Sequence, residues 1–313
     1  MLRIVFFGTP QFAVPTLERL TVSGHQVTGV VTQPDRARGR GQRIVPAPVK
    51  DFAVTHGIPL MQPERLRDPS VEATLRSWEP DLGVVAAYGR IIPAHLLTVP
   101  SHGMINVHAS LLPKYRGAAP VQRAVIAGET ETGVTIMRVA EALDTGDMFA
   151  RATRPIGPDE RSETIERDLA ERGARLLVEV VDAIAAGTAH AEPQDHTRST
   201  YAPRLTREEG LIDWTLPAAD IHNRVRGLSP WPHAYSFLDG HRLIVTTTEP
   251  AGDRTDAPPG TIVNVLSDRL LVATGDGRQI AVREVQPEGR RSMAIRDYLA
   301  GHPIAAGVRF DNR

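Results

Sequence analysis

The sequence contains no cysteine, which excludes disulfide bonds, thiolate nucleophiles and cysteine-ligated metal sites. Lysine is almost absent as well: of the 36 basic residues, all except Lys50 and Lys114 are arginine. A coding bias toward arginine explains this better than a phosphate-binding role of the whole surface, because 37 acidic residues bring the net charge to -1. The overall charge therefore indicates neither nucleic-acid nor membrane binding.

Long hydrophobic runs are missing too. No apolar stretch reaches the roughly 18 residues that indicate a membrane-spanning helix, and no basic leader precedes the apolar residues that begin at Leu2. We therefore expect a cytoplasmic protein without a signal peptide, transit peptide or membrane span. Hydrophobic residues nevertheless make up 41% of the chain, and its 313 residues favour two domains over one.

Strands and helices alternate in the first part of the chain. An apolar run at 2–7 ends in Gly8-Thr9-Pro10 and precedes a helical pattern, which is how doubly wound α/β domains usually begin. The lone Gly8 does not complete a GxGxxG pattern, which argues against NAD binding. Further strands are predicted at 26–32, 81–88, 103–108 and 133–139, and helices near 69–78 and at 162–186. Residues 1–187 are therefore predicted to form an α/β domain with a doubly wound parallel sheet.

The pattern changes after this domain. Residues 188–208 have no apolar period and are predicted to be a linker. From 209 to 313, one helix precedes short strands separated by turns, and Asp239-Gly240 and Asp276-Gly277 are hairpin signals. This spacing predicts a second, smaller domain, a β-barrel of the oligonucleotide-binding (OB) type.

Polar residues gather at the end of the predicted strand 103–108. Asn106 and His108 are two apart, so their side chains project from one face at the carboxyl end of the strand, where open α/β sheets bind ligands. Asp144 is predicted in a turn just after the neighbouring strand, at a loop end of the same sheet. An amide, an imidazole and a carboxylate suit acyl transfer, because the first two can stabilise an oxyanion while the third favours the imidazolium.

From these residues alone, three other interpretations stay open. A polar pair at a strand end is often only a satisfied hydrogen-bond cluster. His108, His102 and Asp144 could hold a metal, although no ligand spacing singles them out. Ser110 could be a hydrolase nucleophile, although its surroundings are not GxSxG.

The second notable stretch is the basic loop, residues 33–50, which carries five basic residues and one acid. Gly39 and Gly41 flank Arg40, so its side chain could be directed outward. Phosphate contact is the functional interpretation of this loop, and a solvated charged loop is the alternative.

Several segments together carry a family resemblance: Phe7 to Pro10, the basic loop, 85–89, Ile105 to Pro120, 131–137, Leu143 to Met148, 212–214 and 257–262. On these segments the chain resembles the methionyl-tRNA formyltransferases along nearly its whole length. The pattern Asn-x-His-x-Ser-Leu-Leu-Pro with a later Asp-Thr-Gly is typical of the wider class of enzymes that use 10-formyltetrahydrofolate. The basic loop and the second domain narrow the resemblance to the tRNA enzymes.

The resemblance implies a Rossmann-like formyltransferase domain joined to an OB-like barrel. It implies transfer of a formyl group from the co-substrate 10-formyltetrahydrofolate to the α-amino group of methionyl initiator tRNA, giving N-formylmethionyl-tRNA for translation initiation. No metal is expected, and the protein is expected to act as a monomer. The implied catalytic residues are Asn106, His108 and Asp144; the implied folate-binding residues are Tyr88, Gly89, Ser110, Leu111, Leu112 and Pro113; the implied tRNA-binding residues are Arg36, Arg38, Arg40 and Arg43.

Two alternative functions remain. A formyltransferase of the same class could act on a small amine such as an amino sugar nucleotide, but such a substrate has little use for a long basic loop. A tRNA-binding module without catalysis is the other, and the intact Asn106, His108 and Asp144 argue against it. The second domain is not basic by count, so we expect the loop to contribute more to tRNA binding than the second domain does.

Overall fold

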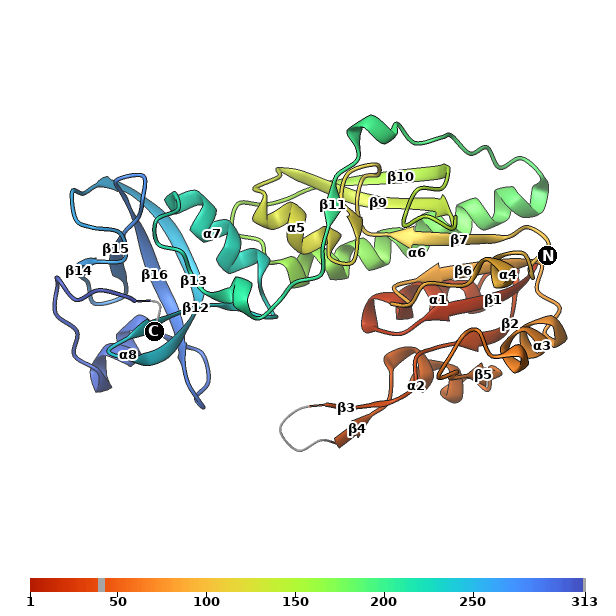
Figure 1. Ribbon diagram of the computed structural model, residues 1–313, viewed down its shortest axis with the longest axis horizontal. Coiled ribbons are helices and arrows are strands. Elements are labelled where there is room, and N and C mark those ends of the chain that lie inside the picture. Colours follow the sequence, from red (N-terminus) through yellow and green to blue (C-terminus); the bar gives the residue numbers. More distant parts are fainter. Residues whose placement is uncertain (39–42, 312–313) are drawn as a thin grey trace. The chain divides into compact units, whose positions relative to one another are not determined.

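The computed structural model describes residues 1–38 and 43–311, with side chains for all of these except 36–38 and 43–44 (Figure 1). The chain divides into two compact units. The first consists of 1–120, 132–154 and 166–202, and the second of 121–131, 155–165 and 203–313. Most of the segment predicted as a linker, 188–208, thus belongs to the first unit.

The first unit is built around a seven-stranded sheet with the order β10-β9-β7-β6-β1-β2-β5 (Figure 1). Its pairs β5–β2, β2–β1, β1–β6 and β6–β7 are parallel, as predicted for an α/β domain. The strands are β1 (Arg3–Gly8), β2 (Gln26–Val31), β5 (Leu60–Met61), β6 (Leu82–Ala86), β7 (Met104–His108), β9 (Glu131–Arg138) and β10 (Met148–Pro155).

The helices of this part of the chain are α1 (Val14–Thr21), α2 (Pro48–Thr55), α3 (Pro69–Ser77), α4 (Ala94–Leu97) and α6 (Ser162–Ala186). The bounds of α6 confirm the predicted helix 162–186, which ends before Gly187 with a φ of 71°. Gly173 of α6 lies so close to the sheet that a Cβ there would be 2.7 Å from Val107 of β7. The glycine therefore lets α6 pack directly on that face of β7.

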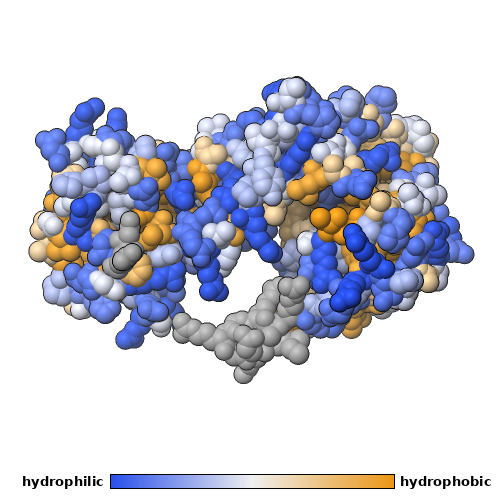
Figure 2. Space-filling view, in the orientation of Figure 1, coloured by the Kyte–Doolittle hydropathy of each residue, from blue (hydrophilic) through white to orange (hydrophobic). Residues whose placement is uncertain are grey.

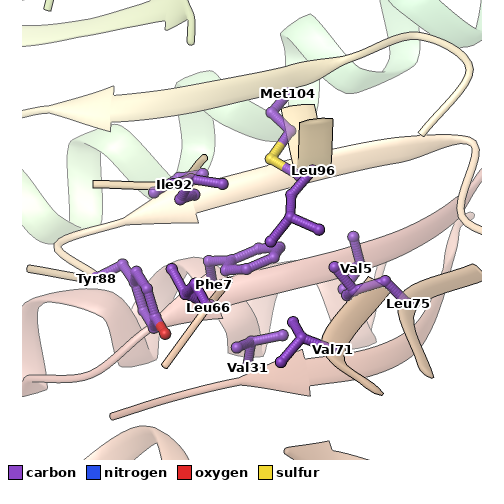
Figure 3. Packing of buried hydrophobic residues seen from close by; sticks show 11 residues of the cluster. Val5, Phe7, Val31, Leu66, Val71, Leu75, Tyr88, Ile92, Leu96 and Met104 are labelled. Atoms are coloured by element: carbon purple, nitrogen blue, oxygen red, sulfur yellow. The ribbon is translucent and has the colours of Figure 1, made fainter. Parts of the chain in front are cut away.

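The opposite face of the sheet carries a cluster of buried hydrophobic side chains (Figure 3). Phe7 of β1 and Met104 of β7 pack there with Leu75 of α3 and Leu96 of α4. Because side chains alternate along a strand, Asn106 and His108 lie on the same face of β7 as Met104, away from α6. The predicted site residues are thus carried by a strand that is buried on both faces.

One strand runs against the predicted direction. β9 is antiparallel to β7, with His108 opposite Thr135 and Ile105 opposite Arg138. A parallel neighbour needs a crossover connection, usually a helix that packs on the sheet. Between β7 and β9 the chain contains the two-residue β8 (Arg116–Gly117) and α5 (Pro120–Ile126), and 121–126 belong to the second unit. The sheet is therefore mixed rather than wholly parallel.

The second unit contains a separate antiparallel sheet with the order β12-β13-β16-β15-β14, and β17 pairs with β16. The hairpin predicted at Asp239-Gly240 joins β12 to β13, and both residues have positive φ (49° and 75°). The elements are α7 (Ala218–Gly227), β12 (Ala234–Leu238), β13 (His241–Arg254), β14 (Ile262–Val265), β15 (Leu270–Ala273), β16 (Arg278–Pro287), β17 (Met293–Ala294) and α8 (Ile295–Gly301).

The last described residues pair with strands at both ends of this sheet. Phe237 of β12 and Asp311 exchange backbone hydrogen bonds of 3.1 and 3.0 Å. The Ile262 N–H at the start of β14 donates to the Val308 carbonyl at 2.8 Å. The segment 308–311 therefore joins the two edge strands.

Hydrophilic residues make up most of the visible surface, with smaller groups of hydrophobic residues between them (Figure 2). In the part of the chain that the structure describes, no helix has the length and apolar character needed to cross a membrane.

Candidate active site

The imidazole of His108 lies at the end of β7, between a backbone carbonyl and a carboxylate. The residue is 5% exposed. Its Nε2 lies 2.9 Å from the Tyr115 carbonyl oxygen, which can only accept, so Nε2 carries a hydrogen. Its Nδ1 lies 3.6 Å from Oδ2 of Asp144, which is too long for a hydrogen bond and within the range of an ion pair. The structure therefore brings together two of the three predicted catalytic residues.

Asn106 precedes His108 by two residues on the same face of β7 and is half-buried. The strand fixes its backbone between Val85 of β6 and Met137 of β9. Among the described residues, none forms a hydrogen bond with the side-chain amide of Asn106. An amide with uncommitted donors beside a buried imidazole can bind an oxygen that gains negative charge.

Asp144 reaches His108 from the loop between β9 and β10, residues 139–147. The predicted turn just after the neighbouring strand is confirmed, but because β9 is antiparallel this strand ends on the side of the sheet away from His108. The loop instead folds back, and Asp144 has a φ of 50°, which is uncommon for a residue with a side chain. Its Oδ2 accepts a hydrogen bond of 2.9 Å from the Gly117 N–H.

Hydrogen bonds define the shape of the loop 110–117. Ser110 is fully buried, and its hydroxyl donates to the Lys114 carbonyl at 2.6 Å. Thr135 donates to the Ser110 carbonyl at 2.7 Å and accepts from the Leu112 N–H at 3.2 Å. The peptide between Leu112 and Pro113 is cis. A buried hydroxyl committed to a backbone carbonyl argues against Ser110 as a nucleophile.

The turn after β6 contains Tyr88 and Gly89. The Tyr88 ring is 2% exposed and packs edge-on against Phe7 at 5.5 Å, within the hydrophobic cluster (Figure 3). Its carbonyl accepts from Gln33 Nε2 at 2.7 Å and from the Thr9 hydroxyl at 3.2 Å. Burial raises the pKa of the Tyr88 hydroxyl to about 12, so it stays protonated near neutral pH. The ring is thus part of the core, whereas the backbone of the turn contacts Thr9 and Gln33.

The change Tyr88→Phe tests this placement. The buried Tyr88 hydroxyl has no hydrogen-bond partner among the residues that the structure describes. Burying such a group costs roughly 1–3 kcal/mol, so we expect the variant to have a free energy of unfolding higher by about 1 kcal/mol in urea titrations. The Michaelis constant (KM) for the folate should be unchanged. A raised KM would show that the hydroxyl faces the folate instead of the core.

A pocket of about 430 Å³ lies between the segment that leads into α4 and the loop after β9, lined by Arg67, Ile91, Ile92, Pro93, Ala94, His95 and Glu141. Ile91 is 84% exposed, which is unusual for so large an apolar side chain. Apolar walls with a few polar groups suit a small ligand with a flat ring system. These residues were not predicted, although the pair Ile91-Ile92, which begins two residues after Gly89, was a usable signal.

The basic loop begins and ends at a polar cluster. Lys50 of α2 forms an ion pair with Asp35, and Gln62 donates to Asp35 Oδ1 and to the Gln33 carbonyl, both at 2.9 Å. Hydrogen bonds from Lys50 and Gln62 lower the pKa of Asp35 below its usual range. One of the two lysines of the chain thus anchors this loop.

Between these anchors the basic loop is not a simple loop. Its backbone forms an antiparallel hairpin of β3 (Arg36–Arg38) and β4 (Arg43–Val45). Arg36, Arg38 and Arg43 therefore lie on hairpin strands, and Arg40 lies outside the described residues.

A metal site finds no support in the geometry. Among residues 1–38 and 43–311, no group of three His, Asp or Glu side chains could hold a metal ion. His102 precedes β7, whereas His108 ends it, so the two cannot share a ligand set with Asp144.

Comparison with known proteins places these residues in a family. The model of the family described as "Formyl transferase" matches residues 2–181, and that of "Formyl transferase, C-terminal domain" matches 204–303. A methionyl-tRNA formyltransferase of Geobacter sulfurreducens is 47% identical over 98% of this chain and 96% of its own length. One of Bacillus licheniformis is 45% identical over 99% of this chain and 98% of its own length.

Solved structures agree on the fold. An N-formyltransferase of Helicobacter canadensis, in complex with folinic acid and dTDP-3-aminofucose, superposes with a TM-score of 0.68 at 17% identity. The match covers 92% of this chain and all of that one. The family models and the relatives matched over nearly the whole length give the same result: the chain belongs to the formyl transferase family.

Proposed function

We propose that this protein transfers the formyl group of 10-formyltetrahydrofolate to the α-amino group of methionyl initiator tRNA. The observation that carries the proposal is the placement of His108 between the Tyr115 carbonyl and the Asp144 carboxylate, with the Asn106 amide beside it on β7. Relatives 45–47% identical over nearly the full length of the chain are named methionyl-tRNA formyltransferases. No metal and no covalent nucleophile is needed for this reaction.

In the proposed reaction, the α-amino nitrogen attacks the formyl carbon, and the bond from that carbon to N10 of the folate breaks. The Asn106 amide and the protonated His108 stabilise the oxyanion formed between these events. Nδ1 is the ring nitrogen that fits this role, because Nε2 is committed to the Tyr115 carbonyl. Asp144 stabilises the imidazolium and supports transfer of the proton lost by the amine to the departing N10.

The folate is assigned to the turn after β6 and to the loops on either side of His108. The pocket that Ile91, Ile92 and Glu141 line adjoins this turn and the Asp144 loop. Gly89, with a φ of 79°, supports the backbone conformation of the turn. Ser110, Leu111, Leu112 and Pro113 belong to the loop that ends at the Tyr115 carbonyl, so this loop can border both the folate and the imidazole.

The tRNA is assigned to the basic loop, with the second unit as an additional contact. The hydrogen bonds from residues 308–311 to both edge strands support the proposal that this unit is an OB-like barrel, a fold that binds oligonucleotides. We place the reaction in the cytoplasm, where initiator tRNA is used, and propose that a single chain suffices because all proposed catalytic groups come from one unit.

The loop assignment predicts the effect of Arg40→Ala. We expect kcat/KM for methionyl initiator tRNA to fall by about tenfold, because a cation that contacts RNA is lost, while folate binding stays intact. Arg19→Ala is the matched control, since Arg19 is an exposed arginine of α1 in the same unit. Unchanged discrimination between initiator and elongator methionyl-tRNA in the Arg40 variant would remove the loop from substrate selection.

The proposal is tested directly by incubating the purified protein with 10-formyltetrahydrofolate and either charged initiator tRNA or dTDP-3-aminofucose. Formylation of the tRNA alone is the expected result. Formylation of the sugar nucleotide alone would replace the proposal with the small-amine alternative. Absence of transfer to either acceptor by folded protein would leave a binding module without catalysis.

A further inference from the structure

The segment 192–202, which we call the strap, contacts both loops that hold His108. On one side, Glu192 and Met148 exchange backbone hydrogen bonds of 2.8 and 2.9 Å, next to the Asp144 loop. On the other, Thr200 accepts from the N–H groups of Tyr115 and Arg116 at 2.8 and 2.9 Å. The strap then pairs as β11 (Tyr201–Ala202) with β8. A stretch without any apolar period thus spans the candidate active site.

The side chain of Gln194 in the strap forms hydrogen bonds with both loops. It is 5% exposed. Its Nε2 donates to the carbonyls of Asp144 and Gly146 at 2.9 and 2.8 Å. Its Oε1 accepts from Nε and Nη2 of Arg116 at 3.1 and 2.7 Å. Both amide hydrogens and the amide oxygen are therefore committed, which fixes the orientation of the side chain.

The conformations that Gln194 holds are not intrinsically favoured ones. Asp144 has a φ of 50° and needs its surroundings to maintain it. Gly117, whose N–H donates to the Asp144 carboxylate, has a φ of 124°, and a Cβ there would lie 2.6 Å from the Ala202 carbonyl oxygen. The strap therefore fixes both the Asp144 backbone and the donor that orients its carboxylate.

We propose that Gln194 is a positioning residue for formyl transfer, which sets the Asp144 carboxylate at the distance that His108 requires, while its bonds from the Arg116 side chain fix its own orientation. It acts through Asp144, because its side-chain hydrogen bonds go to Asp144, Gly146 and Arg116. This inference depends on the proposed function, because Asp144 must be catalytic for its position to matter.

The test uses Gln194→Met, which keeps the length of the side chain and removes all four hydrogen bonds. We expect kcat for tRNA formylation to fall by about tenfold, with KM for both substrates nearly unchanged, because misplaced catalytic groups slow the chemical step. Gln194→Glu keeps the acceptor for Arg116 and loses the donors to the carbonyls of Asp144 and Gly146. A similar loss of kcat in this variant is expected, because the Asp144 side of the amide is the one that matters.

Gln279→Met is the matched control: Gln279 is 7% exposed in β16 and donates one bond of 3.4 Å to the Arg254 carbonyl. We expect its kcat to equal that of the wild type. The deciding measurement repeats Gln194→Met in an Asp144→Asn background, where no further loss beyond about twofold is expected, since the carboxylate is already gone.

An equal loss of kcat in both backgrounds, or a wild-type kcat for folded Gln194→Met, overturns the inference while the wild-type enzyme still formylates tRNA. A wild-type protein without transfer activity contradicts the proposed function instead. The two failures are therefore distinguishable in a single set of assays.

Discussion

Replacing His108 with alanine is expected to lower kcat of tRNA formylation by about 100-fold or more, the usual cost of losing one oxyanion donor. The imidazole is 5% exposed and fixed at Nε2 by the Tyr115 carbonyl, so its Nδ1 is directed rather than free to rotate. The proposed role is confined to the transition state, and KM for the folate and for the tRNA should therefore change little. Steady-state kinetics, with each substrate varied while the other is saturating, measure kcat and both KM values.

The control for this variant exists within the same unit. His25 forms a second histidine–carboxylate pair, with Nε2 2.8 Å from Asp182 Oδ1 and a side chain 4% exposed. His25→Ala removes a ring of similar burial, although its carboxylate partner is 63% exposed, so it measures the structural cost of losing a buried imidazole while kcat stays at the wild-type value. Near-normal turnover of His108→Ala at saturating substrates would refute the assignment of the oxyanion donor.

The parts of the fold that sequence predicted best are those with a local signal. Helix 162–186 was predicted to the residue, because a long amphipathic pattern ends at Gly187. The hairpin at Asp239-Gly240 was predicted from this residue pair, which tolerates positive φ, and both residues have it. The positions of Asn106 and His108 on one face of β7 followed from the period of two along a strand.

The direction of β9 and the path of the Asp144 loop were not predictable in this way. Nothing in the residues 133–139 distinguishes a parallel from an antiparallel strand, since both are apolar runs of similar length. Asp144 reaches His108 only because 139–147 fold back, and hydrogen bonds from Gly117 and Gln194 hold that path. These are contacts between residues 27 and 50 positions apart in the sequence.

The strap was still harder to predict from the sequence. Its strand β11 has two residues, and its main contacts are hydrogen bonds to backbone groups of other segments. Such a segment has neither the alternation of a strand nor the period of a helix, and composition alone makes it resemble a linker. The only signal that could have marked it was Gln194 itself, an amide that is informative only once its burial is known.

Changing Asp144 to asparagine is expected to lower kcat by about 100-fold, because the negative charge that supports the imidazolium is lost while the shape of the side chain is kept. The asparagine oxygen can still accept from the Gly117 N–H, which donates to Oδ2 at 2.9 Å, so the loop should keep its path. Asp144→Ala also leaves that N–H without its acceptor, and we expect it to be less stable than Asp144→Asn.

Asp182→Asn is the matched control, since it removes the carboxylate from the His25 pair and should leave kcat unchanged. Comparing kcat and the free energy of unfolding of Asp144→Asn, Asp144→Ala and Asp182→Asn separates the effect of the lost charge on catalysis from the effect of the lost hydrogen bond on stability. If charge at Asp144 is what matters, the asparagine and alanine variants lose similar activity and differ in stability. Equal stability with wild-type turnover in Asp144→Asn would mean that the carboxylate only orients the Gly117 backbone, and that His108 works without an ionic partner.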